Sequence, residues 1–489
     1  MTKTAKIGWL YAISAVFIAV CMYFMVNKDN YYAFAIPVVL GVMLLYVFSM
    51  EKVLLFISFL TPLSINIENI GGFAISLPVE PMLFGVLALF FAKLIYEGHF
   101  DIKIASHPLS WVIYVMFLWM VVTTITSEMP FVSLKHTLSR LWFVVPAYFM
   151  CALLFKRKAL IDKFIWLYIA GLIIVVFYTI VNHMGYGFDG KSAHWVMTPF
   201  YNDHTAYGAA LAMYFVLAVA YAFMPGLSKL KRLLIYAVIA ILAVALALSY
   251  CRAAWVSLVG AAAVLICVLL KIKFRWILTT FVTLVALFFT FQHQIIDVLE
   301  RNEQDASSDI VENIKSITNI STDASNLERI NRWQSALRLF NERPFFGWGP
   351  GTYQFVYAPY QMSKEKTIIS TNAGDGGNAH SEYIGALAEM GVFGTLIVII
   401  LVATAITRAL KAYARAKNKE TKILLLGAML AIISYFIHGI LNNFLDTDKL
   451  SIPVWSCLAI IAILDSYYAD KESFIGPDDN DKSSDHTSK

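Results

Sequence analysis

Long apolar runs, separated by short polar segments, recur along most of the 489-residue chain. A helix needs roughly 20 apolar residues to cross a bilayer, so each run predicts a membrane span. The third and fourth runs are short, and residues 62–81 between them are expected either to form a loop or to re-enter the membrane. The predicted spans, about fourteen by this length criterion, lie near 8–26, 31–49, 53–66, 80–96, 109–126, 140–156, 160–181, 204–224, 232–250, 252–271, 274–292, 383–407, 422–442 and 451–468.

Composition agrees with this pattern, because 59% of the residues are hydrophobic and only 15% are charged. Soluble domains carry about 25% charged residues. We therefore expect an all-α polytopic membrane protein with four parts. Residues 1–292 hold about eleven spans, 293–382 form a long loop, 383–468 hold about three spans, and 469–489 form a disordered polar tail. The first apolar run is too long for a signal-peptide core, so it predicts a retained span.

Positive charge predicts the orientation. Loops that lie on one side, together with the N-terminus, hold 21 of the 38 Lys and Arg residues, and the short loops of the other side hold 6. Because cytoplasmic loops carry the excess of Lys and Arg, both termini are predicted to be cytoplasmic. The long loop 293–382 would then lie outside the cytoplasm.

The long loop contains one amphipathic pattern. Its apolar positions recur at helical spacing and are followed by Pro344, which ends a helix; they are Ile330, Trp333, Leu337 and Phe340. Asn326 is the expected N-cap. Arg329 and Arg332 flank this stripe, so the helix is predicted to lie on the outer leaflet. The arginines either extend to lipid headgroups or bind a ligand phosphate, for which the planar guanidinium is well suited.

Other polar residues are expected on the same face. Residues 182–208 include Asp203 and His204, and Lys135 and Arg140 fall on a predicted helix at the outer surface. Arg252 lies between two spans, where it marks the membrane boundary or binds an anion. The histidines of 182–208 match no helical ligand pair and no HExxH pattern, so we expect no metal. His380 follows a glycine-rich segment and precedes a span. It is either a residue that caps the helix or a residue that takes part in catalysis.

Two features that the sequence lacks reduce the number of possible functions. The sequence contains no Walker A or GxGxxG element in a suitable context, so a cytoplasmic nucleotide donor, another cofactor or a nucleic-acid partner is not expected. Charged residues at mid-depth of the predicted spans are almost lacking, with His438 and Asp465 as exceptions near helix ends. Proton-coupled transporters usually need such groups, which makes a transporter the weaker hypothesis.

Three ordered elements resemble the O-antigen ligase and O-antigen polymerase superfamily. "SYCRAAWVSL" is similar to its Ser-x-x-Arg segment, matched by Arg252. "ERINRWQSALRLFNERPFFGWGPGTYQF" is similar to an Arg, aromatic, Pro and Gly-rich signature that starts at Arg329. "AHSEYIGALAEMGVFGTL" resembles its His element followed by Glu-x-Gly-x-x-Gly, matched by His380, Glu389 and Gly391. The N-terminal half resembles the family only as a series of spans. The predicted spans outnumber those usual for a ligase, and the long loop is large for one.

The resemblance implies a GT-C-type glycosyltransferase of the bacterial inner membrane, with its active site facing the periplasm. Its donor would be an undecaprenyl-diphosphate-linked glycan, and its acceptor lipid A-core, another glycan or a protein. Transfer would be metal-independent and inverting. The resemblance assigns Arg252 and Arg329 to the diphosphate and His380 to the chemistry. Arg332 is added from its helical spacing alone, and the residues without a motif match rank lower; they are Lys135, Arg140, Asp203 and His204.

Some alternative functions use the same donor, and others belong to a different class. A ligase that attaches O-antigen to lipid A-core is the first hypothesis, and a polymerase or a protein O-oligosaccharyltransferase would use the same donor. A polysaccharide flippase or transporter, or a membrane scaffold without enzymatic activity, belongs to a different class. The sequence does not determine the sugar, the acceptor or the oligomeric state.

Overall fold

The computed structural model describes residues 49–70, 73–272, 324–363 and 377–471. It divides into two compact units, residues 1–56 and 57–489. Of the first unit, the described part is 49–56, which begins helix α3 (Met50–Leu60). The predicted spans 8–26 and 274–292, nearly all of 31–49, and most of the predicted polar tail lie outside the described residues.

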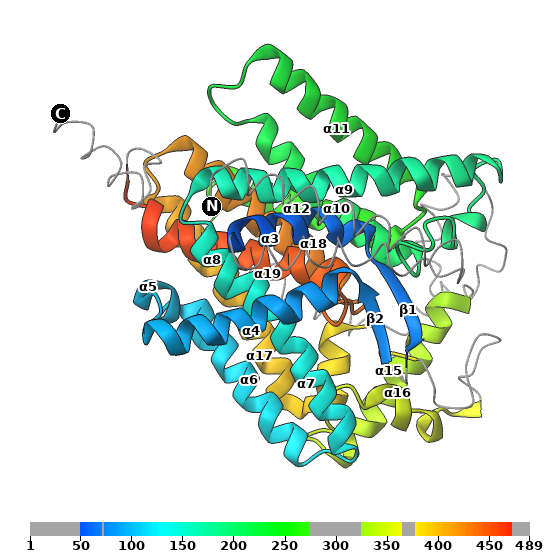
Figure 1. The fold of residues 1–489 in the computed structure, drawn as a ribbon. Helices are drawn as coiled ribbons and strands as arrows, with labels where there is room; N and C mark the ends of the chain where they lie inside the picture. Colours follow the sequence, from blue (N-terminus) through cyan, green and yellow to red (C-terminus); the bar gives the residue numbers. More distant parts are fainter. Residues whose placement is uncertain (1–48, 71–72, 273–323, 364–376, 472–489) are drawn as a thin grey trace, which may run out of the picture. The chain divides into compact units, whose positions relative to one another are not determined.

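The prediction of an all-α multi-pass membrane protein is confirmed (Figure 1). The described residues contain ten helices or helical runs that are long and apolar enough to cross a membrane. One run combines α7 (Pro130–Val144), the π-helix η3 (Val145–Met150) and α8 (Cys151–Leu154), and another combines α19 (Asp448–Ile463) with the π-helix η7 (Leu464–Tyr468). The remaining eight are α4 (Val79–Glu97), α6 (Pro108–Ile125), α9 (Lys158–Met184), α10 (His204–Ala222), α11 (Lys229–Leu248), α12 (Arg252–Leu269), α17 (Glu382–Arg415) and α18 (Lys419–His438).

Three of these helices form the centre of the larger unit. Buried residues make up 78% of the apolar window of both α10 and α18, and 89% of that of α19, against 22% for α11 and α12. Small residues allow the central helices to approach closely. Gly427 on α18 faces Ala220 on α10, where an added Cβ would lie only 2.9 Å from the alanine methyl.

The prediction of a span over 53–66 is wrong. Helix α3 ends at Leu60, and Pro62 lies in the 3-10 turn η2 (Thr61–Leu63). Strands β1 (Ile65–Ile70) and β2 (Phe73–Leu77) then pair antiparallel, with Ile65 opposite Leu77 and Ile67 opposite Ile75. Apolar residues alternate with Asn66 and Ser76, which is the period of a strand. Residues 62–81 therefore contain a β-hairpin, followed by the start of α4.

The helix predicted in the long loop is present as α15 (Ala324–Glu342), but its predicted start was wrong. The helix begins before Asn326, so that residue is not its N-cap. The apolar stripe is not packed inside the protein, since Leu337 is 39% exposed. The buried face is mostly polar and consists of Glu328, Asn331, Arg332, Ser335, Ala336 and Leu339. The short helices α16 (Tyr353–Val356), α5 (Ile102–Ala105) and the 3-10 turns η4 (Ser192–His194) and η5 (Ala358–Tyr360) complete the described elements.

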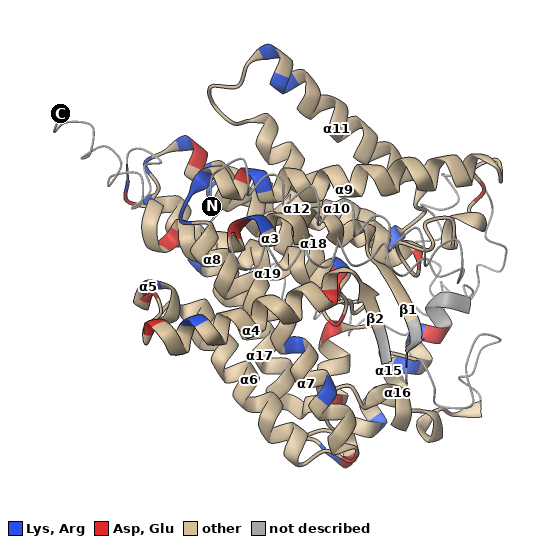
Figure 2. Cartoon of the chain, viewed as in Figure 1, with Lys and Arg blue, Asp and Glu red and all other residues tan. Residues whose placement is uncertain are grey.

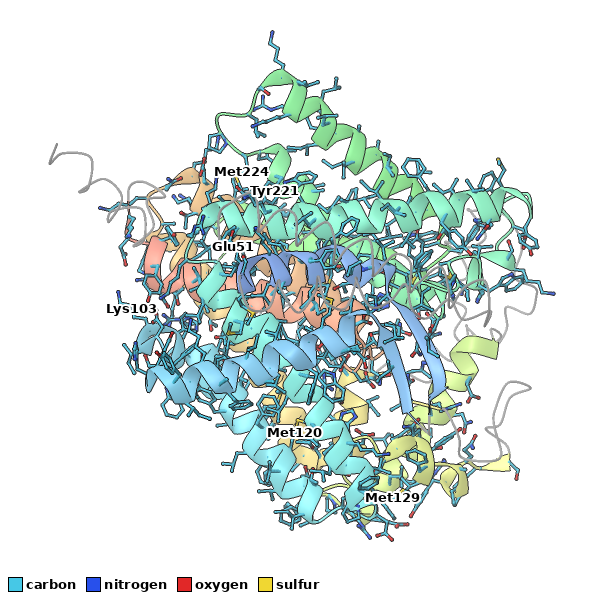
Figure 3. The ribbon with its side chains drawn as sticks, viewed as in Figure 1. Glu51, Lys103, Met120, Met129, Tyr221 and Met224 are labelled. Carbon is cyan, nitrogen blue, oxygen red and sulfur yellow. The ribbon has the colours of Figure 1, made fainter. Side chains whose placement is uncertain are left out.

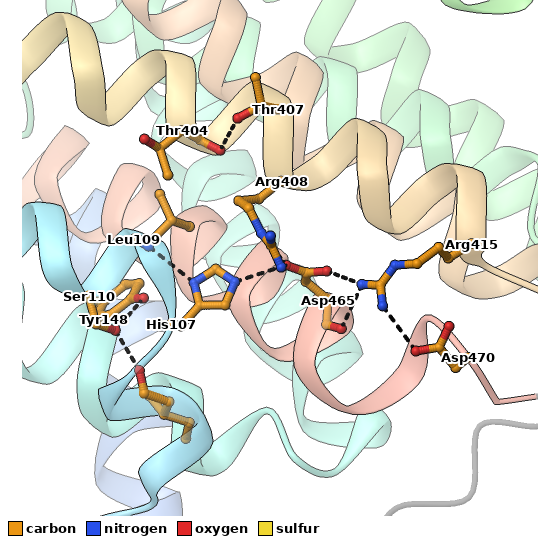
Figure 4. Close-up of polar contacts among 11 residues, drawn as sticks. His107, Leu109, Ser110, Tyr148, Thr404, Thr407, Arg408, Arg415, Asp465 and Asp470 are labelled. Atoms are coloured by element: carbon orange, nitrogen blue, oxygen red, sulfur yellow. Dashed lines mark hydrogen bonds and ion pairs between the residues drawn. The ribbon is translucent and has the colours of Figure 1, made fainter.

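Charged side chains lie mostly at helix ends (Figure 2). At one such end, Asp465 accepts hydrogen bonds from Arg408 at 2.7 Å and from Arg415, and it lies 3.0 Å from the His107 ring nitrogen (Figure 4). Arg415 also pairs with Asp470 at 3.0 Å. This cluster, which we call the Asp465 network, joins the start of α6 to the ends of α17 and α19. Lys103, before α6, and Met129, after it, lie at opposite ends of that helix (Figure 3).

Candidate functional site

His380 lies in a tight turn immediately before α17. Its backbone has a φ of 48°, in the left-handed region that non-glycine residues rarely adopt. The Asn378 side-chain oxygen accepts the His380 N–H at 3.0 Å and supports this conformation. Ser381 then caps α17 by accepting the N–H groups of Tyr383 and Ile384, each at 3.3 Å. The Glu382 N–H donates to the Gly439 carbonyl at 2.8 Å, which fixes the turn to the end of α18.

Two arginines of α15 lie near this turn, and one of them contacts it. Arg332 donates through Nη1 to the Asn378 carbonyl at 3.4 Å, and Arg329 donates through Nε to the Leu441 carbonyl at 3.2 Å. Burial, followed by the positive charges of Arg329 and Arg332, lowers the pKa of His380 from 6.5 to about 4. The imidazole is therefore neutral at pH 7 and can accept a proton.

Asp203 lies close enough to affect the same imidazole, because its negative charge opposes the fall in the His380 pKa. Its main contacts are local. The carboxylate caps α10 by accepting the N–H groups of Thr205 at 2.7 Å and Ala206 at 2.9 Å. Burial would raise the Asp203 pKa, but these hydrogen bonds and the Thr205 hydroxyl hold it below its usual range. Next in the chain is His204, whose ring centroid is 4.0 Å from that of His194.

Arg252 begins α12 in the same region of the structure. The preceding residue, Cys251, has a pKa raised to about 12, chiefly by burial, with Asp203 raising it further and Arg329 lowering it. Asp203 and Arg329 thus lie near the start of α12 as well as near His380. The structure therefore brings together five predicted site residues from four segments of the chain, which we call the His380 cluster: Asp203, Arg252, Arg329, Arg332 and His380.

Lys135 and Arg140 lie elsewhere. Both are on α7, which continues through η3 and α8 as one run long and apolar enough to cross a membrane. The Lys135 ammonium lies over the Phe131 ring at 4.6 Å, and Arg140 donates to the Leu445 carbonyl at 2.6 Å. Arg140 lines a separate cavity, described below.

The glycine-rich turn after Pro344 packs against a break in α17. Gly391 has a φ of 66° inside that helix, and an added Cβ would overlap the Phe345 carbonyl. The carbonyl groups freed by the break accept new donors. The Trp348 N–H donates to Ala388 at 3.0 Å, and the Gly349 N–H donates to Glu389 at 2.8 Å. These glycines consequently fix the loop to α17.

Two buried residues near this site were not among the predicted site residues. His438, at the end of α18, is 1% exposed, and its Nε2 lies 3.1 Å from the Asn442 amide. Its Nδ1 has no hydrogen-bond partner among the described residues. Glu328 is 4% exposed and pairs with Arg332. The sequence placed His438 at a helix end, but no motif joined it to His380.

Residues 237–399 match the model of the O-antigen ligase family. This match supports the resemblance to the O-antigen ligase and polymerase superfamily over about a third of the chain. The matched segment includes Arg252, Arg329, Arg332 and His380, whereas Lys135, Arg140, Asp203 and His204 lie outside it. An uncharacterized protein of Haemophilus influenzae is 26% identical over 161 residues, which are 33% of this chain and 38% of that protein. The chain thus spans well under half the length of this relative.

Proposed function

We propose that the protein transfers a glycan from an undecaprenyl-diphosphate-linked donor to an acceptor hydroxyl, as an O-antigen ligase that acts on lipid A-core. The observation that carries this proposal is the His380 cluster. A neutral imidazole in a strained turn lies beside arginines that come from α12 and α15. This combination provides a base and cations for an anionic leaving group without a metal ion.

In the proposed reaction, an unprotonated ring nitrogen of His380 removes the proton of the acceptor hydroxyl. The acceptor oxygen forms a bond to the anomeric carbon while the bond from that carbon to the diphosphate oxygen breaks. The electron pair stays on the departing undecaprenyl diphosphate, where Arg252 and Arg329 stabilise the growing charge. A single displacement from the opposite face inverts the anomeric configuration.

The low pKa of His380 fits this order of events. Without a donor, the neighbouring arginines keep the imidazole uncharged. A bound diphosphate brings negative charge next to those arginines and raises the His380 pKa towards neutrality. His380 then becomes a stronger base when the donor is in place, and the proton that it accepts is stabilised by the diphosphate.

Location is part of the same proposal. We infer that the site faces the periplasm across the bacterial inner membrane and that both termini are cytoplasmic. The Lys and Arg bias of the short loops supports this orientation. The basic residues of the Asp465 network, Arg408 and Arg415, belong to the loop region predicted to be cytoplasmic, at the opposite end of α17 from His380.

The test uses full-length protein in nanodiscs, a lipid-linked glycan donor and lipid A-core. His380→Ala is expected to reduce kcat by about 10²–10⁴, the usual value of general-base help, while undecaprenyl diphosphate still binds. Arg329→Ala is expected to weaken that binding. His99→Ala and Arg338→Ala are controls, since His99 is exposed and bonds to the Glu97 carbonyl, and Arg338 donates to the Tyr360 carbonyl at 2.7 Å. Wild-type transfer by His380→Ala would contradict the proposed role.

A polymerase would use the same donor chemistry, and the superfamily includes both activities. The products separate the two functions. Loss of a ligase leaves unattached polymer on the lipid carrier, whereas loss of a polymerase leaves products with a single repeat. Single-repeat products in cells that lack this protein would replace the ligase proposal with the polymerase.

A further inference from the structure

A cavity lies on the other side of the His380 turn from the His380 cluster. It has a volume of about 240 Å³ and lies between α6 and α17, with walls that include Asn378, Ala379 and Ser381. Neither His380 nor the arginines Arg252, Arg329 and Arg332 line it. We call it the α6–α17 cavity. One short turn thus separates the cavity from the His380 cluster.

The polar half of the α6–α17 cavity does not suit an anion. Three carboxylates line it, those of Glu382, Glu389 and Asp446, against the single guanidinium of Arg140 and the imidazole of His136. Two of the carboxylates are held in place by backbone N–H groups. Glu382 accepts from Phe444 at 2.8 Å, and Glu389 accepts from Tyr353 at 3.1 Å. Carboxylates repel a diphosphate but accept hydrogen bonds from hydroxyl groups.

Two side chains in the cavity wall have unused hydrogen-bonding atoms. Trp455 on α19 is 1% exposed, and its Nε1–H has no acceptor among the described residues. The side-chain oxygen of Asn443 likewise has no donor there. A buried polar atom without a partner costs free energy, so such atoms usually have one. A ligand hydroxyl, which both donates and accepts, would satisfy either atom.

The other half of the cavity is apolar. Met116 and Met120 of α6 line it together with Val398 and Leu401 of α17. Trp119, which also lines the cavity, stacks on Phe346 with ring centroids 5.7 Å apart, and Phe346 is 45% exposed. This half suits an alkyl chain or the apolar part of a lipid anchor.

We propose that the α6–α17 cavity binds the acceptor: the hydroxylated sugar headgroup of a membrane glycolipid, with the apolar part of that lipid between α6 and α17. This inference rests on the proposed glycan transfer. The donor diphosphate then lies with the arginines on one side of the His380 turn, and the acceptor sugar lies on the other. The turn would select which hydroxyl reaches the imidazole.

The first experiment measures acceptor kinetics with lipid A-core in nanodiscs. Trp455→Phe removes one indole N–H and keeps an aromatic ring, and Asn443→Ala removes the free amide oxygen. Each variant is expected to raise the acceptor KM about 3- to 10-fold, as expected for the loss of one hydrogen bond. The donor KM should stay unchanged. Trp142→Phe is the matched control, because the Trp142 Nε1–H also lacks a partner among the described residues but Trp142 does not line the cavity. An equal effect of Trp455→Phe and Trp142→Phe would overturn the assignment.

The second experiment does not depend on transfer. An alkyl disaccharide with a photoreactive diazirine in its alkyl chain is cross-linked to the full-length protein, and the labelled peptides are identified by mass spectrometry. Labelling is expected on α6 and α17, and it should fall in Trp455→Phe but not in Trp142→Phe. Labelling confined to other helices would overturn the inference. If the cavity is labelled as expected but undecaprenyl diphosphate neither binds nor supports transfer, the donor chemistry fails while the sugar-binding cavity stands.

Discussion

Arg332 donates a hydrogen bond of 2.7 Å to Glu328 one helical turn before it, and both side chains are buried. The Arg332 guanidinium also lies over the Tyr357 ring at 4.5 Å, and the Tyr353 hydroxyl donates to the Arg332 carbonyl at 2.8 Å. Arg332 therefore holds α15, α16 and the His380 turn together, whether or not it also meets the diphosphate.

Arg332→Ala should destabilise the protein by about 3–5 kcal/mol, since it leaves the Glu328 carboxylate buried without its partner. Arg332→Lys should recover only part of this loss, because an ammonium lacks the planar stacking surface. Thermal unfolding in nanodiscs measures both. Arg343→Ala is the comparison. Arg343 forms an ion pair with Glu128, whose side chain is 51% exposed. It should cost no more than about 2 kcal/mol, and an equal loss in both alanine variants would contradict the buried role of Arg332.

The pH dependence of transfer should report His380. Its pKa in the free protein is about 4, so the acid limb of kcat/KM is expected near that value. The acid limb of kcat should lie at higher pH, because the bound diphosphate stabilises the imidazolium. Charged groups that act on His380 are Arg329, Arg332 and Glu328 from α15 and Asp203 from the segment before α10. Coincident limbs for the two parameters would contradict the coupling to the diphosphate.

The same pKa has a consequence for stability. Between pH 6.5 and 4 the unfolded chain protonates His380 while the folded chain does not, so the unfolded state binds more protons. The free energy of unfolding therefore falls as pH falls through this window. The loss that His380 causes is complete below about pH 4. Thermal unfolding of the wild type and His380→Gln from pH 7 to 4.5 should show a smaller loss in the variant.

Gly391→Ala tests the break in α17. Alanine disfavours a φ of 66°, and its Cβ would overlap the Phe345 carbonyl, so the variant should lose about 2–5 kcal/mol of stability. Gly385→Ala is the matched control, because its Cβ would meet the Ala379 methyl at an ordinary 3.6 Å within a helical turn. Protease sensitivity of the loop, measured beside thermal unfolding, should increase in Gly391→Ala only.

Asp465→Asn should destabilise the protein by about 3–5 kcal/mol, because Arg408, Arg415 and His107 all meet this one buried carboxylate. Asp470→Asn, whose side chain is 71% exposed, should cost about 1 kcal/mol or less. Glycan transfer by the folded fraction should stay near wild type in both variants, since the Asp465 network lies at the other end of α17 from His380. A selective loss of kcat in Asp465→Asn would show instead that the two ends are coupled.

Hydrophobic patterning predicted most of the described spans, because apolar runs long enough to cross a bilayer leave few alternative structures. It failed where two patterns compete. Residues 53–66 are apolar, but Pro62 and the alternation of Ile65, Asn66 and Ile67 favour a turn and a strand. On α15 the periodicity of Trp333 and Leu337 identified an apolar face without showing what that face meets. The polar face of α15 is the one that packs inside the protein.

The candidate site was predicted unevenly for a similar reason. Arg252, Arg329 and His380 lie in ordered motifs, and the structure brings them into one region, while their chemical roles remain predictions. The cavity beside them depends on Asn443, Asp446 and Trp455, which come from a short loop and from the centre of an apolar helix. Only the packing of α6 and α19 against α17 brings these residues to the turn, and no local pattern encodes that packing.

The break at Gly391 also separates His380 from the mechanics of the bilayer. A span adapts to a thicker or thinner membrane by tilting. The segment Glu382–Met390 is tied to the glycine-rich turn and to Gly439, whereas the remainder of α17 continues as the span beyond the break. If the part of α17 after Gly391 tilts, the backbone at Gly391 can bend, and His380 need not rotate. We therefore expect the geometry of the proposed reaction centre to be insulated from variations in lipid thickness.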